Sequence, residues 1–126
     1  MKETDVMIVD TGCPRTLCGE DWLMDYLKEN NLKKGDLEIA KCCQYFRFGP
    51  GQVYHSGEEI NLPVAFVRKE SDVLNNELFY TKIKVFVVKE AKVPILCGRN
   101  TLKVWGAVLD IKNSVLKMEF KGKKSF

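Results

Sequence analysis

The sequence predicts an all-β domain with one or two short helices. Short runs of β-branched and aromatic residues recur along the chain, and glycine, proline and asparagine separate them, which is typical of strands joined by turns. The apolar spacing of a helix is clear in one segment. With 45% of its 126 residues hydrophobic, the chain can fill one modest core, so we expect a single domain over residues 1–126.

The N-terminal part contains two short strands and the clear helix. Residues 5–9 form an apolar strand that leads directly into Asp10, and residues 16–18 form a second short strand. The helix covers residues 20–30, because acidic residues occupy its first turn and stop signals, including Gly35, follow it. Its two aromatic residues are expected in the core, on an apolar face that consists of Trp22, Leu23, Tyr26 and Leu27.

The middle of the chain predicts a hairpin and two longer strands. Residues 44–48 alternate aromatic and polar side chains, stop at Gly49-Pro50-Gly51 and resume at residues 52–54, which indicates a hairpin with a glycine-rich tip. Two further strands follow, over residues 60–67 and 79–88. A polar loop over residues 68–77 joins them.

The C-terminal part consists of short elements. An apolar run covers residues 93–97, and a short helix is predicted over residues 100–105. Residues 107–111 and 115–120 form a final pair of strands around a turn at Asn113-Ser114.

Charge and cysteine content restrict the partners and the compartment. The net charge is +3, and the lysines are spread along the chain apart from residues 121–124, so nucleic acid is not an expected partner. Apolar runs such as residues 85–88 are too short to span a bilayer, and the N-terminus lacks a signal-peptide pattern, so no membrane is expected. Five cysteines, with Cys42 and Cys43 adjacent, cannot all pair within the chain and predict an intracellular, reducing compartment.

The residues with the clearest chemical potential are Asp10-Thr11-Gly12. A carboxylate at the end of an apolar strand is costly to bury unless a nearby group pairs with it or uses it. No basic residue lies within two positions of Asp10. Taken alone, the triplet is explained by a simple turn in which the aspartate binds its own backbone, so it gains meaning only in combination with other motifs.

Two further motifs follow the triplet. The hairpin tip Phe48-Gly49-Pro50-Gly51-Gln52 comes first, and the apolar residues 94–97 then lead into Gly98-Arg99-Asn100 and a helical start. This order of strand, Asp-Thr-Gly, glycine-rich hairpin, apolar run, glycine, helix and terminal strand covers nearly the whole chain. It resembles the retropepsins, the aspartic proteases of retroviruses and LTR retrotransposons.

The resemblance implies a fold, a partner and a reaction. The implied fold is a closed, barrel-like β domain with a flap hairpin and one or two short helices, assembled as a two-fold homodimer. The chain has one triplet, so Asp10 of each protomer would supply one of two carboxylates that activate a water molecule to hydrolyse a peptide bond. Thr11 and Gly12 would support this loop. No cofactor is implied, and the expected substrate is a polypeptide, the parent polyprotein, in the cytoplasm or a virus-like particle.

The resemblance also assigns the other site residues. The flap consists of Phe48, Gly49, Pro50, Gly51 and Gln52. An apolar substrate groove is lined by Cys13, Leu17, Val93, Pro94 and Leu96. Residues with a structural role near the active site are Thr16, Gly98, Arg99 and Asn100, and Asn100 is expected to form a hydrogen bond near Thr16.

The chain departs from the family pattern at three places. Cys13 stands where Ala or Ser is usual. Pro14 and Arg15 stand where related viral members carry the acidic partner of the arginine in Gly-Arg-Asn, which leaves the partner of Arg99 open. The helical segment 20–30 is longer than in compact viral enzymes, which favours a retrotransposon or domesticated relative.

The sequence also bears on three other classes of function, of which one is compatible with its motifs. A catalytically weak or inactive retropepsin-fold module, which dimerises or binds peptides, would keep the same motifs. A Cys-His nucleophilic site is not indicated, because no neighbouring residue in the sequence orients His55, which is expected to be exposed. A metal site is not expected either, because the spacings of zinc-binding motifs are missing among Cys13, Cys18, Cys42, Cys43 and His55.

Overall fold

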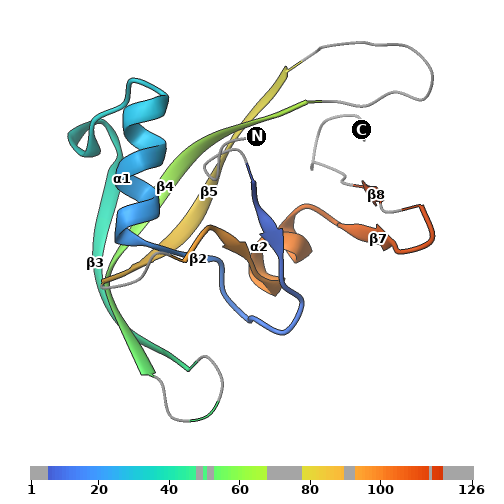
Figure 1. Cartoon of the computed structure of the whole chain (residues 1–126), viewed down its shortest axis with the longest axis horizontal. Helices are drawn as coiled ribbons and strands as arrows, with labels where there is room; N and C mark the ends of the chain where they lie inside the picture. Colours follow the sequence, from blue (N-terminus) through green and yellow to red (C-terminus); the bar gives the residue numbers. More distant parts are fainter. Residues whose placement is uncertain are drawn as a thin grey trace.

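The computed structural model describes residues 6–47, 50, 53–67, 78–89, 93–113 and 115–117. Most of these residues lie in strands, and the described part of the chain also contains two α-helices (Figure 1). The expected all-β class with one or two helices is therefore confirmed at this level.

The strands form two sheets. The large sheet contains both parallel and antiparallel pairs, and the small sheet is antiparallel. The six-stranded sheet has the order β1-β6-β2-β5-β4-β3, and β7 and β8 form a separate pair. The strands of the large sheet, in that order, are Ile8–Val9, Leu96–Cys97, Leu17–Gly19, Leu78–Val88, Val53–Val67 and Glu38–Arg47. The small sheet consists of β7 (Val108–Asp110) and β8 (Val115–Lys117).

The large sheet is open, so the closed, barrel-like domain that the resemblance implies is not found. In the residues that the structure describes, β1 and β3 are the two edges of the sheet and do not pair with each other. β1 has two residues, and β3 exposes most of its side chains. Neither edge therefore offers both the hydrogen-bonding length and the apolar surface that closure needs. This part of the fold prediction is wrong.

Strand β6 lies between β1 and β2, although it comes much later in the chain. It runs parallel to β1, with Leu96 opposite Ile8, and antiparallel to β2, with Leu96 opposite Leu17. The chain therefore passes from β1 to β2 through residues 10–16, around the end of β6 (Figure 1). This arrangement brings the loop that follows Asp10 next to Gly98.

Helix α1 (Glu20–Glu29) agrees with the predicted helix to within one residue. Trp22, Leu23 and Leu27 are buried, and the Trp22 and Tyr26 rings stack at 5.1 Å between centroids. The Tyr26 hydroxyl donates to the Pro63 carbonyl at 2.8 Å, which fixes the helix against β4. A short 3-10 turn, η2 (Lys34–Asp36), follows the helix.

Helix α2 (Arg99–Val104) also matches its prediction to within one residue. Gly106, directly after the helix, has a φ of 57°, a left-handed conformation that glycine adopts without steric cost. The Gly106 N–H donates to the Lys103 carbonyl and the Ala107 N–H to the Leu102 carbonyl, which satisfies two acceptors at the helix end.

The main core lies between α1 and the central strands. It contains the buried face of α1 and apolar residues of β4 and β5, and Trp105 closes it beside Phe66 with ring centroids 5.3 Å apart. The members of the core with no exposed surface are Leu23, Cys18, Leu62, Val85 and Cys97. A second cluster lies on the side of the β3–β4 hairpin and is described with the site below.

The β3–β4 hairpin is confirmed, and its strands are longer than the sequence predicts. β3 begins at Glu38 and not at residue 44, and β4 is continuous over 15 residues, Val53–Val67. Arg47 pairs with Val53, so the turn lies where it was expected. Of the predicted tip, only Pro50 lies within the described residues, where it forms an exposed turn.

The hairpin ends in a two-stranded ribbon beyond the reach of β5. The last pair between β4 and β5 is Ser56 with Val88, so among the described residues those at 53–55 of β4 pair with β3 alone. The register shifts there on both sides of β4, because Cys42 and Cys43 of β3 lie opposite Gly57, and Gly57 is also an extra residue relative to β5. These β-bulges mark the root of the ribbon, which extends past the sheet at the bottom of Figure 1.

Several predicted segments lie outside the described residues: the loop over residues 68–77, residue 5 of the first strand, and residues 118–120 of the last. Neither helix in the described part of the chain has the length and apolar character needed to cross a membrane.

Candidate active site

The Asp10 loop is fixed to β6 by backbone hydrogen bonds. The Ile8 N–H donates to the Ile95 carbonyl and the Asp10 N–H to the Cys97 carbonyl, each at 3.0 Å. These bonds continue the parallel pairing of β1 and β6 up to the point where the loop begins. Asp10 therefore stands at the end of a sheet strand, on a backbone that its neighbour holds in place.

The carboxylate of Asp10 is half-buried and forms a local turn. Its Oδ1 accepts the Gly12 N–H at 3.0 Å, and the Cys13 N–H donates to the Asp10 carbonyl at 3.2 Å. Within the described residues, this is the one hydrogen bond of the carboxylate. The simple turn considered from the sequence is thus present, and in the part of the chain that the structure describes Oδ2 forms no hydrogen bond. Thr11 and Gly12 are both exposed beside it.

Gly98 lies directly against the backbone of the Asp10 loop. A Cβ at this position would be 2.4 Å from the Arg15 carbonyl oxygen and 2.8 Å from the Cys13 carbonyl oxygen. Both atoms belong to the backbone and cannot rotate away. Only glycine allows the two segments to approach this closely, and the approach lets the Arg99 N–H donate to the Cys13 carbonyl at 2.8 Å and the Asn100 N–H to the Pro14 carbonyl at 3.1 Å.

The Thr16 side chain joins the loop to α2 in a buried hydrogen-bond network. Its Oγ1 accepts the Gly98 N–H at 3.0 Å and donates to Asn100 Oδ1 at 3.1 Å, while the Thr16 N–H also donates to Asn100 Oδ1, at 2.9 Å. The Thr101 hydroxyl forms a further hydrogen bond with Thr16 Oγ1. The expected hydrogen bond of Asn100 near Thr16 is therefore confirmed, and the network ties the loop to the start of the helix.

Replacing Thr16 by valine should lower the free energy of unfolding by about 2 kcal/mol, because the Gly98 N–H and the Thr101 hydroxyl would lose a buried partner. Denaturant unfolding of Thr16→Val, Thr101→Val and the double variant measures this loss and the coupling between the two hydroxyls, which we expect near about 1 kcal/mol. A loss below about 0.5 kcal/mol for Thr16→Val would contradict the role given to the network.

Cys13, the unusual residue after the triplet, is buried beside Asp10. Its thiol donates to the Arg15 carbonyl at 2.9 Å. Burial raises the pKa of the Cys13 thiol; the Arg15 hydrogen bond lowers this pKa, the Asp10 charge raises it, and the Arg99 charge lowers it. Arg99 is exposed and forms no ion pair with any described residue. The Arg99 guanidinium thus lies close enough to Cys13 for its positive charge to lower the pKa of the thiol.

Four of the five predicted groove residues meet in one apolar cluster. Cys13, Leu17 and Leu96 are buried members, and Val93 packs against them. Pro94 is half-buried and lies outside the cluster. Leu17 has no exposed surface in the single chain. The remaining buried members are Phe46 of β3 and Phe86 and Val88 of β5.

Phe46 links the hairpin to the Asp10 loop. It lies one residue before the last residue of β3, and its ring is 5.6 Å from that of Phe86 between centroids. Phe46 and Cys13 belong to the same cluster, so the end of β3 that leads into the predicted flap and the loop that carries Asp10 share one apolar cluster. Phe48, Gly49, Gly51 and Gln52 of the flap lie outside the described residues.

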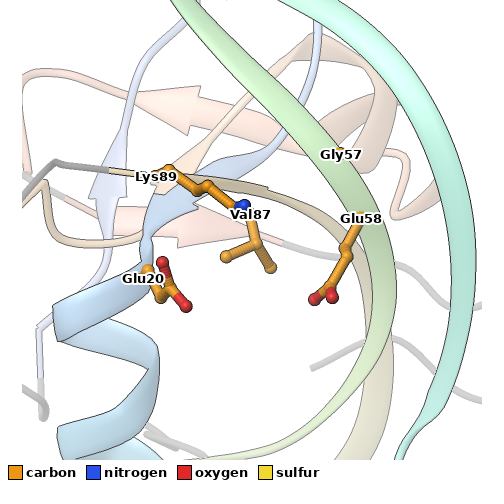
Figure 2. Close-up of a pocket in the computed structure, with 5 residues that line it drawn as sticks. All are labelled: Glu20, Gly57, Glu58, Val87 and Lys89. Atoms are coloured by element: carbon orange, nitrogen blue, oxygen red, sulfur yellow. The ribbon is translucent and has the colours of Figure 1, made fainter.

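A small pocket lies away from this site. It has a volume of about 130 Å³ and does not include Asp10, and Figure 2 shows its lining, with Glu20 from the start of α1 and Glu58 from β4. Such a volume holds a few water molecules and is smaller than a typical ligand site. In the part of the chain that the structure describes, no three side chains of the His, Cys, Asp and Glu types come together as a metal site.

Sequence reasoning missed two features of the site region. The first is the hydrogen bond between Thr101 and Thr16. Thr101 directly follows Asn100, which was already expected to contact Thr16, and this position is a signal that could have identified it. Cys43 and His55 face each other across β3 and β4. Their proximity depends on the register of β3 and β4, and this register cannot be predicted without knowing where the bulge lies.

Comparison with known proteins gives no match to a family model, to a curated protein or to a solved structure. The function is therefore argued from the residues and the geometry of this chain.

Proposed function

We propose that the chain is one protomer of a homodimeric aspartic endopeptidase of the retropepsin type. The observation that carries the proposal is the position of Asp10. It stands at a strand end, in a loop that Gly98 and Asn100 fix from one side, and the Cys13 side chain of this loop shares an apolar cluster with Phe46 of the hairpin. The backbone of Asp10 is thus held by its neighbours, and among the described residues one oxygen of its carboxylate forms no hydrogen bond.

A single chain supplies half of the required chemistry. Peptide hydrolysis needs a base to take a proton from the attacking water and an acid to donate one to the carbonyl oxygen. One carboxylate cannot do both at once. Two copies of Asp10, related by a two-fold axis, share one proton because two close carboxylates cannot both remain ionised. The ionised carboxylate then acts as the base and the protonated one as the acid.

The exposure of the loop agrees with assembly through this face. Thr11 and Gly12 are exposed in the single chain, although the loop that carries them is held by backbone hydrogen bonds. In the proposed dimer, they meet the same residues of the second copy. The Thr11 hydroxyl then donates across the axis, and Gly12 allows a substrate backbone to approach.

The proposed substrate is an extended polypeptide. It would lie between the Asp10 loop and the end of the β3–β4 hairpin and bind mainly through its backbone, with apolar side chains toward the cluster that contains Leu17 and Leu96. The natural substrate under this proposal is the polyprotein from which the domain derives.

Incubation of the purified chain with a peptide library at mildly acidic pH tests the proposal. We expect endoproteolytic products, identified by mass spectrometry, with apolar residues on both sides of the cut. The protein should be dimeric under the same conditions in sedimentation. A dimer that cleaves nothing over the acidic to neutral range would instead favour a module that dimerises or binds peptides without turnover.

A further inference from the structure

Cys43 and His55 form a thiol–imidazole pair at the root of the hairpin ribbon. Cys43 Sγ and His55 Nε2 are 3.5 Å apart, and both residues are exposed. The Tyr45 ring lies opposite His55 in the β3–β4 register and packs against the imidazole, with ring centroids 5.0 Å apart. When Nε2 carries no proton, it accepts the Cys43 S–H. The pair thus combines a nucleophile, a base and access from solvent.

The other four thiols lack this combination. Cys13, Cys18 and Cys97 are buried. Burial raises the pKa of Cys18 to about 12 and that of Cys97 to about 11, and it also raises the pKa of Cys13. These thiols remain protonated near neutral pH and are poor nucleophiles. Cys42 is half-buried, and its thiol lies near the carbonyl and hydroxyl of Ser56, 3.6 and 3.8 Å away, with no base among its described hydrogen-bond partners.

We propose that Cys43 is a site of reversible S-thiolation by low-molecular-weight disulfides such as oxidised glutathione, with His55 as the base. The imidazole takes the Cys43 proton as Sγ attacks one sulfur of the disulfide. A new Cys43–sulfur bond forms, the original disulfide bond breaks, and the second thiol leaves with the proton from His55. One protein thiol and one disulfide thus become one mixed disulfide and one free thiol.

The position of Cys43 gives this modification a structural consequence. Cys43 is one of the two residues opposite Gly57 in the bulge where the ribbon begins. A bulky charged adduct there changes the contacts between β3 and β4 at the point from which the ribbon extends. The effect on activity rests on the proposed function: if the ribbon covers the substrate, S-thiolation of Cys43 slows peptide cleavage.

Mass spectrometry of the intact full chain, followed by peptide mapping, tests the site. After treatment with oxidised glutathione at neutral pH, we expect one adduct, located on Cys43 and removed by dithiothreitol. His55→Gln should slow the reaction of Cys43 by about tenfold, whereas Cys42→Ser should leave its rate unchanged. Circular dichroism checks that each variant is folded. Adducts spread over several cysteines of the wild type, or an equal rate in folded His55→Gln, would overturn the proposal.

A second measurement separates this inference from the proposed function. The rate of peptide cleavage is compared for the modified and the reduced wild type, with Cys43→Ser, which cannot carry the adduct, as the control. Slower cleavage by the modified wild type alone supports the link to the hairpin. If the adduct forms on Cys43 but neither form of the wild type cleaves peptides, the site stands and the proposed function fails. If cleavage occurs but Cys43 remains unmodified, the proposed function stands and the proposed S-thiolation of Cys43 fails.

Discussion

Asp10→Asn should reduce the rate of peptide cleavage by about a thousandfold or more, because an amide can neither take a proton from water nor donate one as a carboxylic acid does. The stability of the chain should change little. The side-chain oxygen of asparagine can still accept the Gly12 N–H, which is the one hydrogen bond of the carboxylate within the described residues. Cleavage rates and thermal unfolding of the two proteins measure the two effects separately.

Asp25→Asn is the matched control. Asp25 lies on the exposed side of α1, away from the Asp10 loop, so the same change of charge there should leave the cleavage rate within about twofold of the wild type. Equal cleavage by Asp10→Asn and wild type would show that the activity comes from another residue or from a contaminating protease.

Gly98→Ala should lower the free energy of unfolding by at least about 3 kcal/mol. The added Cβ would meet the Arg15 carbonyl carbon at 2.5 Å and its oxygen at 2.4 Å, so the Asp10 loop must move away from α2. That movement also breaks the hydrogen bond from the Gly98 N–H to Thr16. For a chain of this length we expect the melting temperature to fall by roughly 10 °C.

Gly35→Ala provides the comparison for this variant. Gly35 is exposed in the 3-10 turn, and nothing lies within 4 Å of the position of an added Cβ. Its melting temperature should therefore remain within about 2 °C of the wild type. If Gly98→Ala melted as Gly35→Ala does, the close contact between Gly98 and the Asp10 loop would not exist in solution.

Elements with strong local signals were predictable from the sequence. Helix α1 has an apolar face, acidic residues in its first turn and asparagines at its end, and its bounds were predicted to within one residue. The hairpin turn between Arg47 and Val53 was predicted from the glycines and proline of its tip. In both cases, neighbouring residues in the chain determine the structure.

Features that depend on distant contacts were harder to predict. The first half of β3 is an exposed edge strand whose pairing with β4 provides its structure, so residues 38–43 show no alternation of apolar and polar side chains. The open sheet was missed because closure depends on how the short β1 and the exposed β3 could meet. The closed barrel was predicted from the resemblance alone. Local sequence patterns do not show which strands lie at the edges of a sheet, so they could not correct this prediction.

The site was predicted in part for the same reason. The contact between Thr16 and Asn100 was expected from motif positions, and the structure adds Thr101 to it. The groove residues were assigned by the resemblance, which does not reveal that Leu17 is fully buried in the single chain. The pair of Cys43 and His55 depends on a one-residue bulge that no local pattern marks.

The most direct test of the central claim is a mixing experiment with Asp10→Asn chains. A fixed amount of wild-type chain is mixed with increasing amounts of the variant, allowed to exchange protomers, and assayed for peptide cleavage. If each active site requires Asp10 from two chains, random pairing with an equal amount of variant should reduce the rate to about half, and a threefold excess to about a quarter. A rate that stays at the wild-type value despite demonstrated exchange of protomers would mean that one Asp10 is sufficient, and it would contradict the shared catalytic pair.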